Sequence, residues 1–228
     1  MSGDSFARRS LPRIAVFVVS LGVLATVVLL VDGGGPAETE VPLVCADDAA
    51  SVASPLLAQR MHDVALVGMD RQPVMLSDLG GGRFTVAVFC SYKCPCSDGY
   101  VDRLRELRRE YESRGVAFIA IHSSADEHID GMLDYIERKN YPLPVYRDDT
   151  GVAADELHAT VTPEAFVFDS AWTLRYQGHI DDDKSGLLVE DESLRLALDT
   201  LLGGGTLRST EKASLGCAIV RADHEGDQ

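Results

Sequence analysis

The chain has 228 residues, of which 46% are hydrophobic and 25% charged, and its formal net charge at pH 7 is −15. This acidity argues against nucleic acid or an anionic lipid surface as a partner, because both would repel the chain. Beyond the N-terminal segment described next, about 190 residues remain, which is enough for one domain with a sizeable core.

The N-terminus has the pattern of a membrane anchor. Residues 1–13 contain Arg8, Arg9 and Arg13, and residues 14–31 contain no charged residue. A stretch of this length is about the minimum for a membrane-spanning helix, and the preceding arginines favour a cytoplasmic N-terminus. We therefore expect a single-pass anchor that places the rest of the chain on the extracytoplasmic side, periplasmic or extracellular. A cleaved signal peptide is the alternative, and it exports the same residues.

The remainder divides into a linker, a domain and a tail. Residues 32–60 are rich in Gly, Pro, Ala and acidic residues, which indicates a linker, and they contain Cys45. Residues 61–205 form the predicted domain, and residues 206–228 form a tail that contains Cys217. In an exported chain disulfides can persist, and the odd total of five cysteines leaves at least one thiol unpaired or paired elsewhere.

Strand and helix patterns alternate along the domain. Two short β runs at 64–67 and 74–76 flank a turn and predict a hairpin. The further predicted elements, in order, are a strand at 84–90, a helix at 97–114, a strand at 115–123, a helix at 125–140, a strand at 143–149, a short helix at 152–159, strands at 164–169 and 173–180, and a helix at 191–202. This alternation predicts an α/β domain with a parallel sheet, helices on both faces and an antiparallel pair of strands at one edge.

Three of the five cysteines lie within FCSYKCPCSDGY, residues 89–100. Cys94 and Cys96 fall in the turn between the strand and the next helix, where sheets of this class bind their ligands. A helix N-terminus and the cation of Lys93 both favour a thiolate, and Pro95 suits the first helical turn. We expect Cys94 to be the nucleophile. Cys96 is a candidate to resolve an oxidised Cys94, although a Cys-x-Cys disulfide closes a small, strained ring.

Two other interpretations of this cysteine-rich segment are a structural role for Cys90 and a metal site. Cys90 ends an apolar strand, so a buried structural thiol is favoured there over a catalytic one. Alternatively, Cys90, Cys94 and Cys96 together with His158 could hold a soft metal such as Cu(I) or Zn, because thiolates and imidazoles are the ligands that these ions prefer.

Several segments resemble the peroxiredoxin-like redoxins of the thioredoxin-fold superfamily. They are FCSYKCPCSDGY, GVAFIAIHSS, PVYRDDTGVAADELHATVTPEAFVFD, LRYQGHIDDD and LGCAI, and the likeness covers roughly residues 62–220. The resemblance implies a thioredoxin-like fold, with a central mixed sheet flanked by helices. It also implies that Cys94 is the attacking cysteine, that Ser91 supplies a hydroxyl, and that Thr162–Pro163 is a cis-proline bond beside the cysteine.

The chain departs from the family pattern at two positions. Ala87 stands where peroxiredoxins carry a proline, and Ser97 stands where thioredoxin-type reductases carry a second cysteine. Peroxide reduction and disulfide exchange therefore both remain open. Cys217 matches a C-terminal cysteine of such redoxins, and it is either a resolving thiol or the partner of Cys45.

These observations predict a membrane-anchored, extracytoplasmic thiol oxidoreductase that needs no organic cofactor, because cysteine itself carries the electrons. Its expected partners are a protein disulfide or a hydroperoxide as substrate and an external thiol as reductant. Two alternatives belong to other classes. One is a Cu(I)- or Zn-binding metallochaperone on the same fold, and the other is a redox-inactive binding module.

Overall fold

The computed structural model describes residues 56–207 and 211–221. The predicted anchor at 14–31, most of the predicted linker and Cys45 lie outside these residues, so their predictions stay open. In the part of the chain that is described, no helix is both long and apolar enough to cross a membrane.

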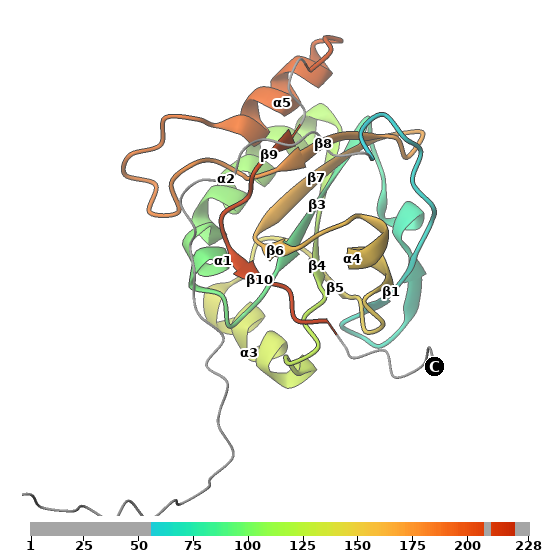
Figure 1. The fold of residues 1–228 in the computed structure, drawn as a ribbon, viewed down its shortest axis with the longest axis vertical. Coiled ribbons are helices and arrows are strands. Elements are labelled where there is room, and N and C mark those ends of the chain that lie inside the picture. The colour runs from blue at the N-terminus through green and yellow to red at the C-terminus, as the bar shows by residue number, and fades with distance from the viewer. Residues whose placement is uncertain (1–55, 208–210, 222–228) are drawn as a thin grey trace, which may run out of the picture. The chain divides into compact units, whose positions relative to one another are not determined.

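The domain is built on a mixed sheet with the strand order β2-β1-β5-β4-β3-β7-β8-β9 (Figure 1). The strands are β1 (Ala65–Gly68), β2 (Pro73–Met75), β3 (Phe84–Cys90), β4 (Val116–His122), β5 (Val145–Arg147), β7 (Glu164–Asp169), β8 (Leu174–Gly178) and β9 (Glu211–Lys212). Strands β3, β4 and β5 are parallel, whereas β1 pairs antiparallel with β2 and β5, and β7 pairs antiparallel with β3 and β8. The predicted hairpin, the parallel centre and the antiparallel β7–β8 pair are therefore confirmed.

The helices also occur where the apolar periodicity predicts them. They are α1 (Pro95–Gly99), α2 (Val101–Tyr111), α3 (Ile129–Lys139), α4 (Val152–Glu156) and α5 (Ser193–Leu202), with short 3₁₀ turns η1 (Leu76–Leu79) and η2 (Glu112–Arg114). The single helix predicted over 97–114 is interrupted at Tyr100 (φ −96°, ψ −2°). It ends at Gly115, whose φ of 85° is a left-handed conformation that glycine adopts at low cost.

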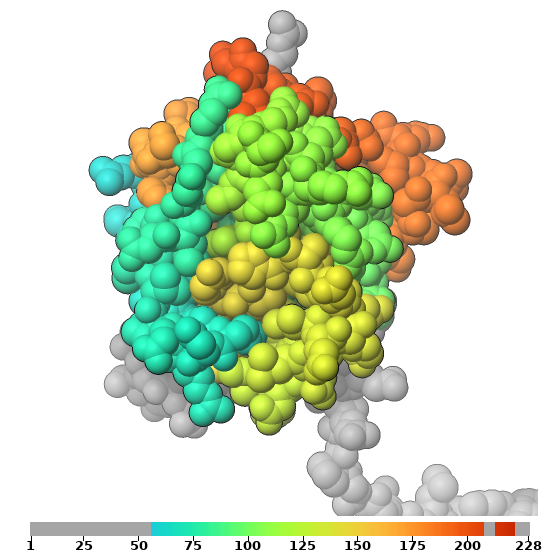
Figure 2. Space-filling model, turned by 180° about the vertical axis from the view of Figure 1, so that it is seen from behind, coloured from blue at the N-terminus to red at the C-terminus, as the bar shows by residue number. Residues whose placement is uncertain are grey.

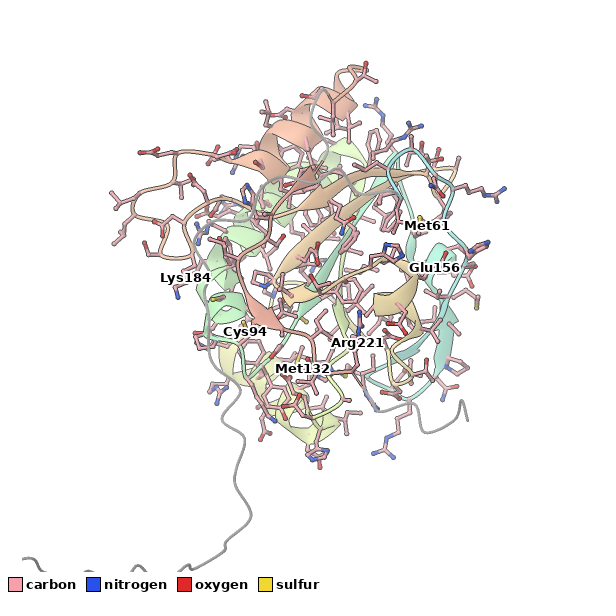
Figure 3. The ribbon with its side chains drawn as sticks, viewed as in Figure 1. Met61, Cys94, Met132, Glu156, Lys184 and Arg221 are labelled. Atoms are coloured by element: carbon pink, nitrogen blue, oxygen red, sulfur yellow. The ribbon has the colours of Figure 1, made fainter. Side chains whose placement is uncertain are left out.

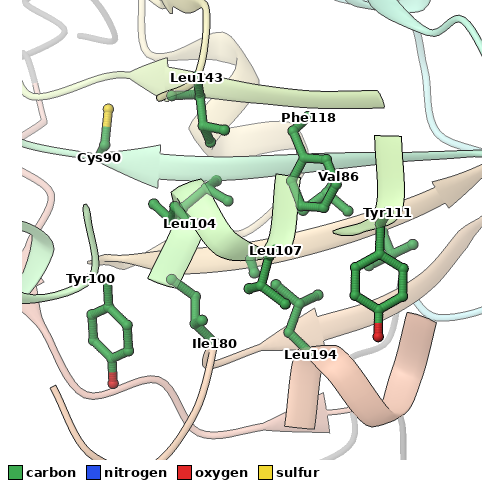
Figure 4. Close-up of a cluster of buried hydrophobic side chains, with 14 of the residues drawn as sticks. Val86, Cys90, Tyr100, Leu104, Leu107, Tyr111, Phe118, Leu143, Ile180 and Leu194 are labelled. Atoms are coloured by element: carbon green, nitrogen blue, oxygen red, sulfur yellow. The ribbon is translucent and has the colours of Figure 1, made fainter. Parts of the chain in front are cut away.

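Both faces of the sheet are covered, which explains why β3 is apolar at every position except Thr85, which is itself buried. Successive side chains of a strand point to opposite faces. Val86 and Val88 belong to the cluster formed with α2, α3 and α5 (Figure 4), whereas Ala87 and Phe89 pack into a second cluster with α4 and the β1–β2 region. From behind, the blue-green hairpin residues lie beside the yellow residues around β5 (Figure 2), in agreement with the β1–β5 pairing.

A second, two-stranded sheet was not predicted. It consists of β6 (Val161–Thr162) and β10 (Cys217–Ala218), which pair antiparallel (Figure 1). Two-residue strands have no measurable periodicity, so β6, β9 and β10 have no signature in the sequence. This small sheet brings the C-terminal segment to the end of β3, where the candidate site lies.

Candidate active site

Cys94 is the N-cap residue of α1. Its sulfur accepts a hydrogen bond from the backbone N–H of Ser97 at 3.3 Å, and Pro95 follows as the first helical residue. Proline suits this position because its missing N–H would have no partner inside the helix. The predicted placement of Cys94 at a helix N-terminus, directly after a buried strand, is confirmed.

The other partner of Cys94 is the backbone of Thr162. The Cys94 thiol donates to the Thr162 carbonyl oxygen at 3.0 Å, and the Thr162–Pro163 bond is cis. The predicted cis-proline beside the cysteine is therefore confirmed. Cys94 is only 2% exposed, yet both of these contacts to its sulfur are polar. A thiol makes both bonds, whereas a thiolate keeps the Ser97 N–H and can no longer donate to the carbonyl.

Cys217 lies opposite Thr162 in the β10–β6 pair. The sulfur atoms of Cys94, Cys96 and Cys217 all lie within 4.8 Å of one another, and none of the three is in a disulfide. Figure 3 shows Cys94 beside β10. Burial raises the pKa of the Cys217 thiol, and its hydrogen bond to Cys94 raises that pKa further. Sequence alone related Cys217 to this site only through resemblance; the β6–β10 pairing brings it there.

The segment that carries Cys217 is held down along its length. A Cβ on Gly216 would lie 2.2 Å from the Thr162 carbonyl oxygen, so only glycine permits this close approach of the two backbones. The Ile219 N–H donates to Thr160 at 2.9 Å, and the Arg221 guanidinium donates to two backbone carbonyls in and just after α4. Residues 216–221 therefore form a fixed strap across the site, which we call the C-terminal strap.

An ammonium from a distant segment lies beside Cys96. Lys184 Nζ lies 3.9 Å from Cys96 Sγ, and Cys96 is 1% exposed. Lys184 belongs to the loop between β8 and α5 (Figure 3). The sequence analysis missed this residue, and no local signal could have found it, because 88 positions separate the two side chains.

The structure gives Lys93 a different partner from the one expected. Its ammonium contacts the Asp126 carboxylate at 3.0 Å and the Asp126 backbone oxygen at 2.6 Å, and this pairing raises the pKa of Lys93. Both side chains are about half exposed. The role of Lys93 in stabilising a Cys94 thiolate stays a prediction, and the ion pair with Asp126 weakens it.

Ser91 also has partners other than the attacking sulfur. Its hydroxyl donates to the Glu127 carboxylate and accepts from the Lys93 N–H at 3.1 Å. Glu127 further accepts from the Tyr92 N–H at 3.1 Å and lies 2.9 Å from His122 Nε2, with both side chains almost fully buried. Glu127 thus holds the turn before Cys94 in place. Sequence reasoning missed it, because an acid within ADEHID is more typical of a solvated helix start.

Cys90 lies in the core, as its position at the end of an apolar strand predicts (Figure 4). Burial raises its pKa to about 12, against a lowering effect of the hydrogen bond from Tyr141. The alternative metal set of Cys90, Cys94, Cys96 and His158 is not the group that the fold assembles. Of the described residues, Cys94 and Cys96 are joined by Cys217, and Cys90 and His158 stay outside the group.

The fold and the geometry around Cys94 together define the structural class of the protein. A mixed sheet covered by helices on both faces, a cysteine that caps the helix after a buried parallel strand, and a cis-proline backbone against its sulfur are the features of a thioredoxin-like redoxin. Residues 57–177, more than half of the chain, match the AhpC/TSA family. The chain therefore belongs to the AhpC/TSA family, and it is a thiol oxidoreductase of the redoxin type.

Solved structures agree with this assignment. An uncharacterized conserved protein from Geobacillus kaustophilus is 30% identical, with a TM-score of 0.68, over 77% of this chain and 98% of that one. The fold is shared with a putative thiol:disulfide interchange protein DsbE from Chlorobium tepidum (18% identity, TM-score 0.55, 64% and 98% covered). It is also shared with the peroxidoxin BcpB from Mycobacterium tuberculosis, at 18% identity and a TM-score of 0.51, over 64% of this chain and 96% of that one. No curated protein matches the chain in sequence.

Proposed function

We propose that this chain is a membrane-anchored, extracytoplasmic thiol oxidoreductase that exchanges disulfides through Cys94 and Cys217. One observation carries the proposal: the Cys94 sulfur lies between the Ser97 N–H and the Thr162 carbonyl, with the Cys217 thiol hydrogen-bonded to it from the paired strand. Two thiols in contact at the end of a buried strand are suited to a two-electron dithiol–disulfide couple.

The first step is attack on a substrate disulfide. Cys94 loses its proton to solvent, the thiolate forms a bond to one substrate sulfur, and the other substrate sulfur leaves as a thiolate. The Ser97 N–H, which donates to the Cys94 sulfur, stabilises the anion before the attack. The result is a mixed disulfide between Cys94 and the substrate.

The second step is attack by Cys217 on the Cys94 sulfur, which forms a Cys94–Cys217 disulfide and releases the second substrate thiol. We assign this step to Cys217 rather than to Cys96 because a Cys-x-Cys disulfide closes a small, strained ring, whereas Cys217 lies on a separate strand. Two equivalents of an external thiol then reduce the disulfide, leave as their own disulfide and return the protein to the dithiol state.

Peroxide reduction is the second candidate, and the burial of Cys94 favours it. With Cys94 only 2% exposed, a hydroperoxide enters more easily than a protein disulfide, which must displace the C-terminal strap. In that reaction the Cys94 thiolate takes the terminal oxygen, an alcohol leaves, and Cys217 converts the sulfenic acid to the same disulfide with loss of water. We rank it second because the Ser91 hydroxyl bonds Glu127 and not the site of attack.

The location of the domain rests on sequence. Three arginines followed by the uncharged residues 14–31 support an anchor with the domain outside the cytoplasm. A membrane-impermeant thiol reagent applied to intact cells, after reduction with an impermeant phosphine, should label the chain. Labelling only after lysis would contradict the proposed location without affecting the chemistry.

Activity is tested on the reduced full chain, kept in detergent, with one equivalent of a peptide disulfide or of hydrogen peroxide. We expect faster consumption of the disulfide, loss of both reactions in Cys94→Ser, and a Cys94–Cys217 disulfide as the product found by mass mapping. Faster consumption of peroxide would select the second candidate. Unchanged turnover in Cys94→Ser would overturn both.

A further inference from the structure

We propose that the reduced protein holds a soft monovalent cation, Cu(I), in a three-coordinate site formed by the sulfurs of Cys94, Cys96 and Cys217. This inference goes beyond the oxidoreductase and does not depend on it. It starts from the grouping of three sulfur atoms contributed by two segments that lie more than a hundred positions apart in the sequence.

The spacing of the sulfurs fits such a site. With metal–sulfur bonds of about 2.3 Å, a trigonal arrangement places its sulfurs about 4 Å apart. The three sulfurs lie within 4.8 Å of one another before any ion is bound. The sulfurs therefore need to approach one another by less than about 1 Å to reach bonding distance of a shared ion.

The number and type of ligands select the ion. Thiolates are soft ligands that prefer Cu(I), zinc and iron–sulfur clusters. Zinc is almost always four-coordinate. Among the described residues, no fourth Cys, His, Asp or Glu ligand joins the group, and Cys94 and Cys96 are at most 2% exposed, which restricts water as a fourth ligand. A site with three sulfurs, of which only that of Cys217 belongs to a partly exposed residue, therefore favours Cu(I), which accepts three ligands, over Zn(II).

A cation beside Cys96 and an N–H donor beside Cys94 favour two of the three thiolates that the ion requires. Binding breaks three S–H bonds, forms three Cu–S bonds and releases three protons to solvent, and the copper keeps its oxidation state. The bound group then carries a net charge of −2. The Lys184 ammonium, 3.9 Å from Cys96 Sγ, and the Ser97 N–H, 3.3 Å from Cys94 Sγ, both stabilise this negative charge.

Metal binding and disulfide formation exclude each other at this site. A Cys94–Cys217 disulfide removes two of the three ligands, so only the dithiol state binds Cu(I). Cys96 has no part in the proposed disulfide exchange, yet it is one of the three metal ligands. This difference separates the two activities experimentally.

The test is an anaerobic titration of the reduced full chain, in detergent, with Cu(I) in competition with bicinchoninate, a chromophoric Cu(I) chelator. We expect one Cu(I) per chain and three sulfur neighbours by X-ray absorption. Cys96→Ser and Cys217→Ser should each weaken binding by about tenfold or more. Cys90→Ser is the matched control, because this core cysteine lies outside the group, and its affinity should equal that of the wild type.

Several results would overturn the site. The site fails if the protein does not retain Cu(I) against bicinchoninate. It also fails if the wild type shows only two sulfur neighbours and Cys217→Ser shows the same two, or if Cys90→Ser loses as much affinity as the ligand variants. Cys96→Ser should bind Cu(I) weakly while it keeps its Cys94–Cys217 disulfide chemistry. If instead it binds copper normally and loses disulfide exchange, the metal site and the assignment of Cys217 as the resolving thiol both fail.

Discussion

Replacement of Cys217 by serine should leave the first step of disulfide exchange intact and slow the second. The Cys94 and Cys217 sulfurs lie within 4.8 Å of each other. One thiol confined to a sphere of that radius has a local concentration of about 4 M, roughly 10³ times that of a millimolar external thiol. We therefore expect the second step to be roughly 10³-fold slower in Cys217→Ser when an external thiol at about 1 mM must replace the internal one.

A symmetrical aromatic disulfide whose thiolate is coloured makes both steps visible. In the wild type, attack by Cys94 releases one coloured thiolate and attack by Cys217 releases the second. The Cys217→Ser variant should release the first at the wild-type rate and the second only slowly. Cys96→Ser is the control and should release both. Circular dichroism and thermal unfolding check that each variant is folded.

Two outcomes would refute this reasoning. One is release of the second thiolate from Cys217→Ser at the wild-type rate, which would show that another group resolves the mixed disulfide. The other is a Cys94–Cys96 disulfide in the oxidised wild type, which would show that the strained ring forms in preference to the bond between strands.

Three further predictions concern neighbouring residues. Because burial raises the pKa of Cys90 from 9.0 to about 12, its thiol stays protonated in the folded state while the unfolded chain ionises, so stability is lost as pH rises above 9. The wild type should lose about 2 kcal/mol of unfolding free energy between about pH 9 and about pH 10.5 through this group, and Cys90→Val should lack this contribution in urea titrations. Glu127→Ala should lower the unfolding free energy by about 3 kcal/mol or more, since it leaves the Ser91 hydroxyl, the Tyr92 N–H and His122 without their carboxylate partner. Asp126→Asn, at a half-exposed pair, should cost less than about 1 kcal/mol, and equal losses would contradict the role of Glu127. Lys93→Gln should change the rate of the first thiolate release by less than about threefold, and a larger decrease would restore Lys93 as an activating group for the Cys94 thiolate.

Local sequence patterns were enough to predict most of the sheet and the position of Cys94. The run FTVAVFC is apolar apart from Thr85 because β3 is covered on both faces, and the helical spacing of Val101, Leu104 and Leu107 marks the face that α2 buries. The end of the strand and Pro95 then fix Cys94 at the N-cap of α1. These features depend on residues within a few positions of one another, so their signals are present in the sequence.

The composition of the site depended on contacts between distant segments. Lys184 and Glu127 come from other parts of the chain, and nothing in their own neighbourhoods identifies them. Cys217 was a candidate only through the resemblance of LGCAI, and its place beside Cys94 depends on the β6–β10 pairing. The sequence itself supplied the strand, the turn and the attacking thiol. Only the tertiary structure decided which thiol faces Cys94 and which cation lies beside Cys96, because hydrogen bonds and ion pairs between segments depend on how the strands and loops are brought together, and a linear pattern does not record this.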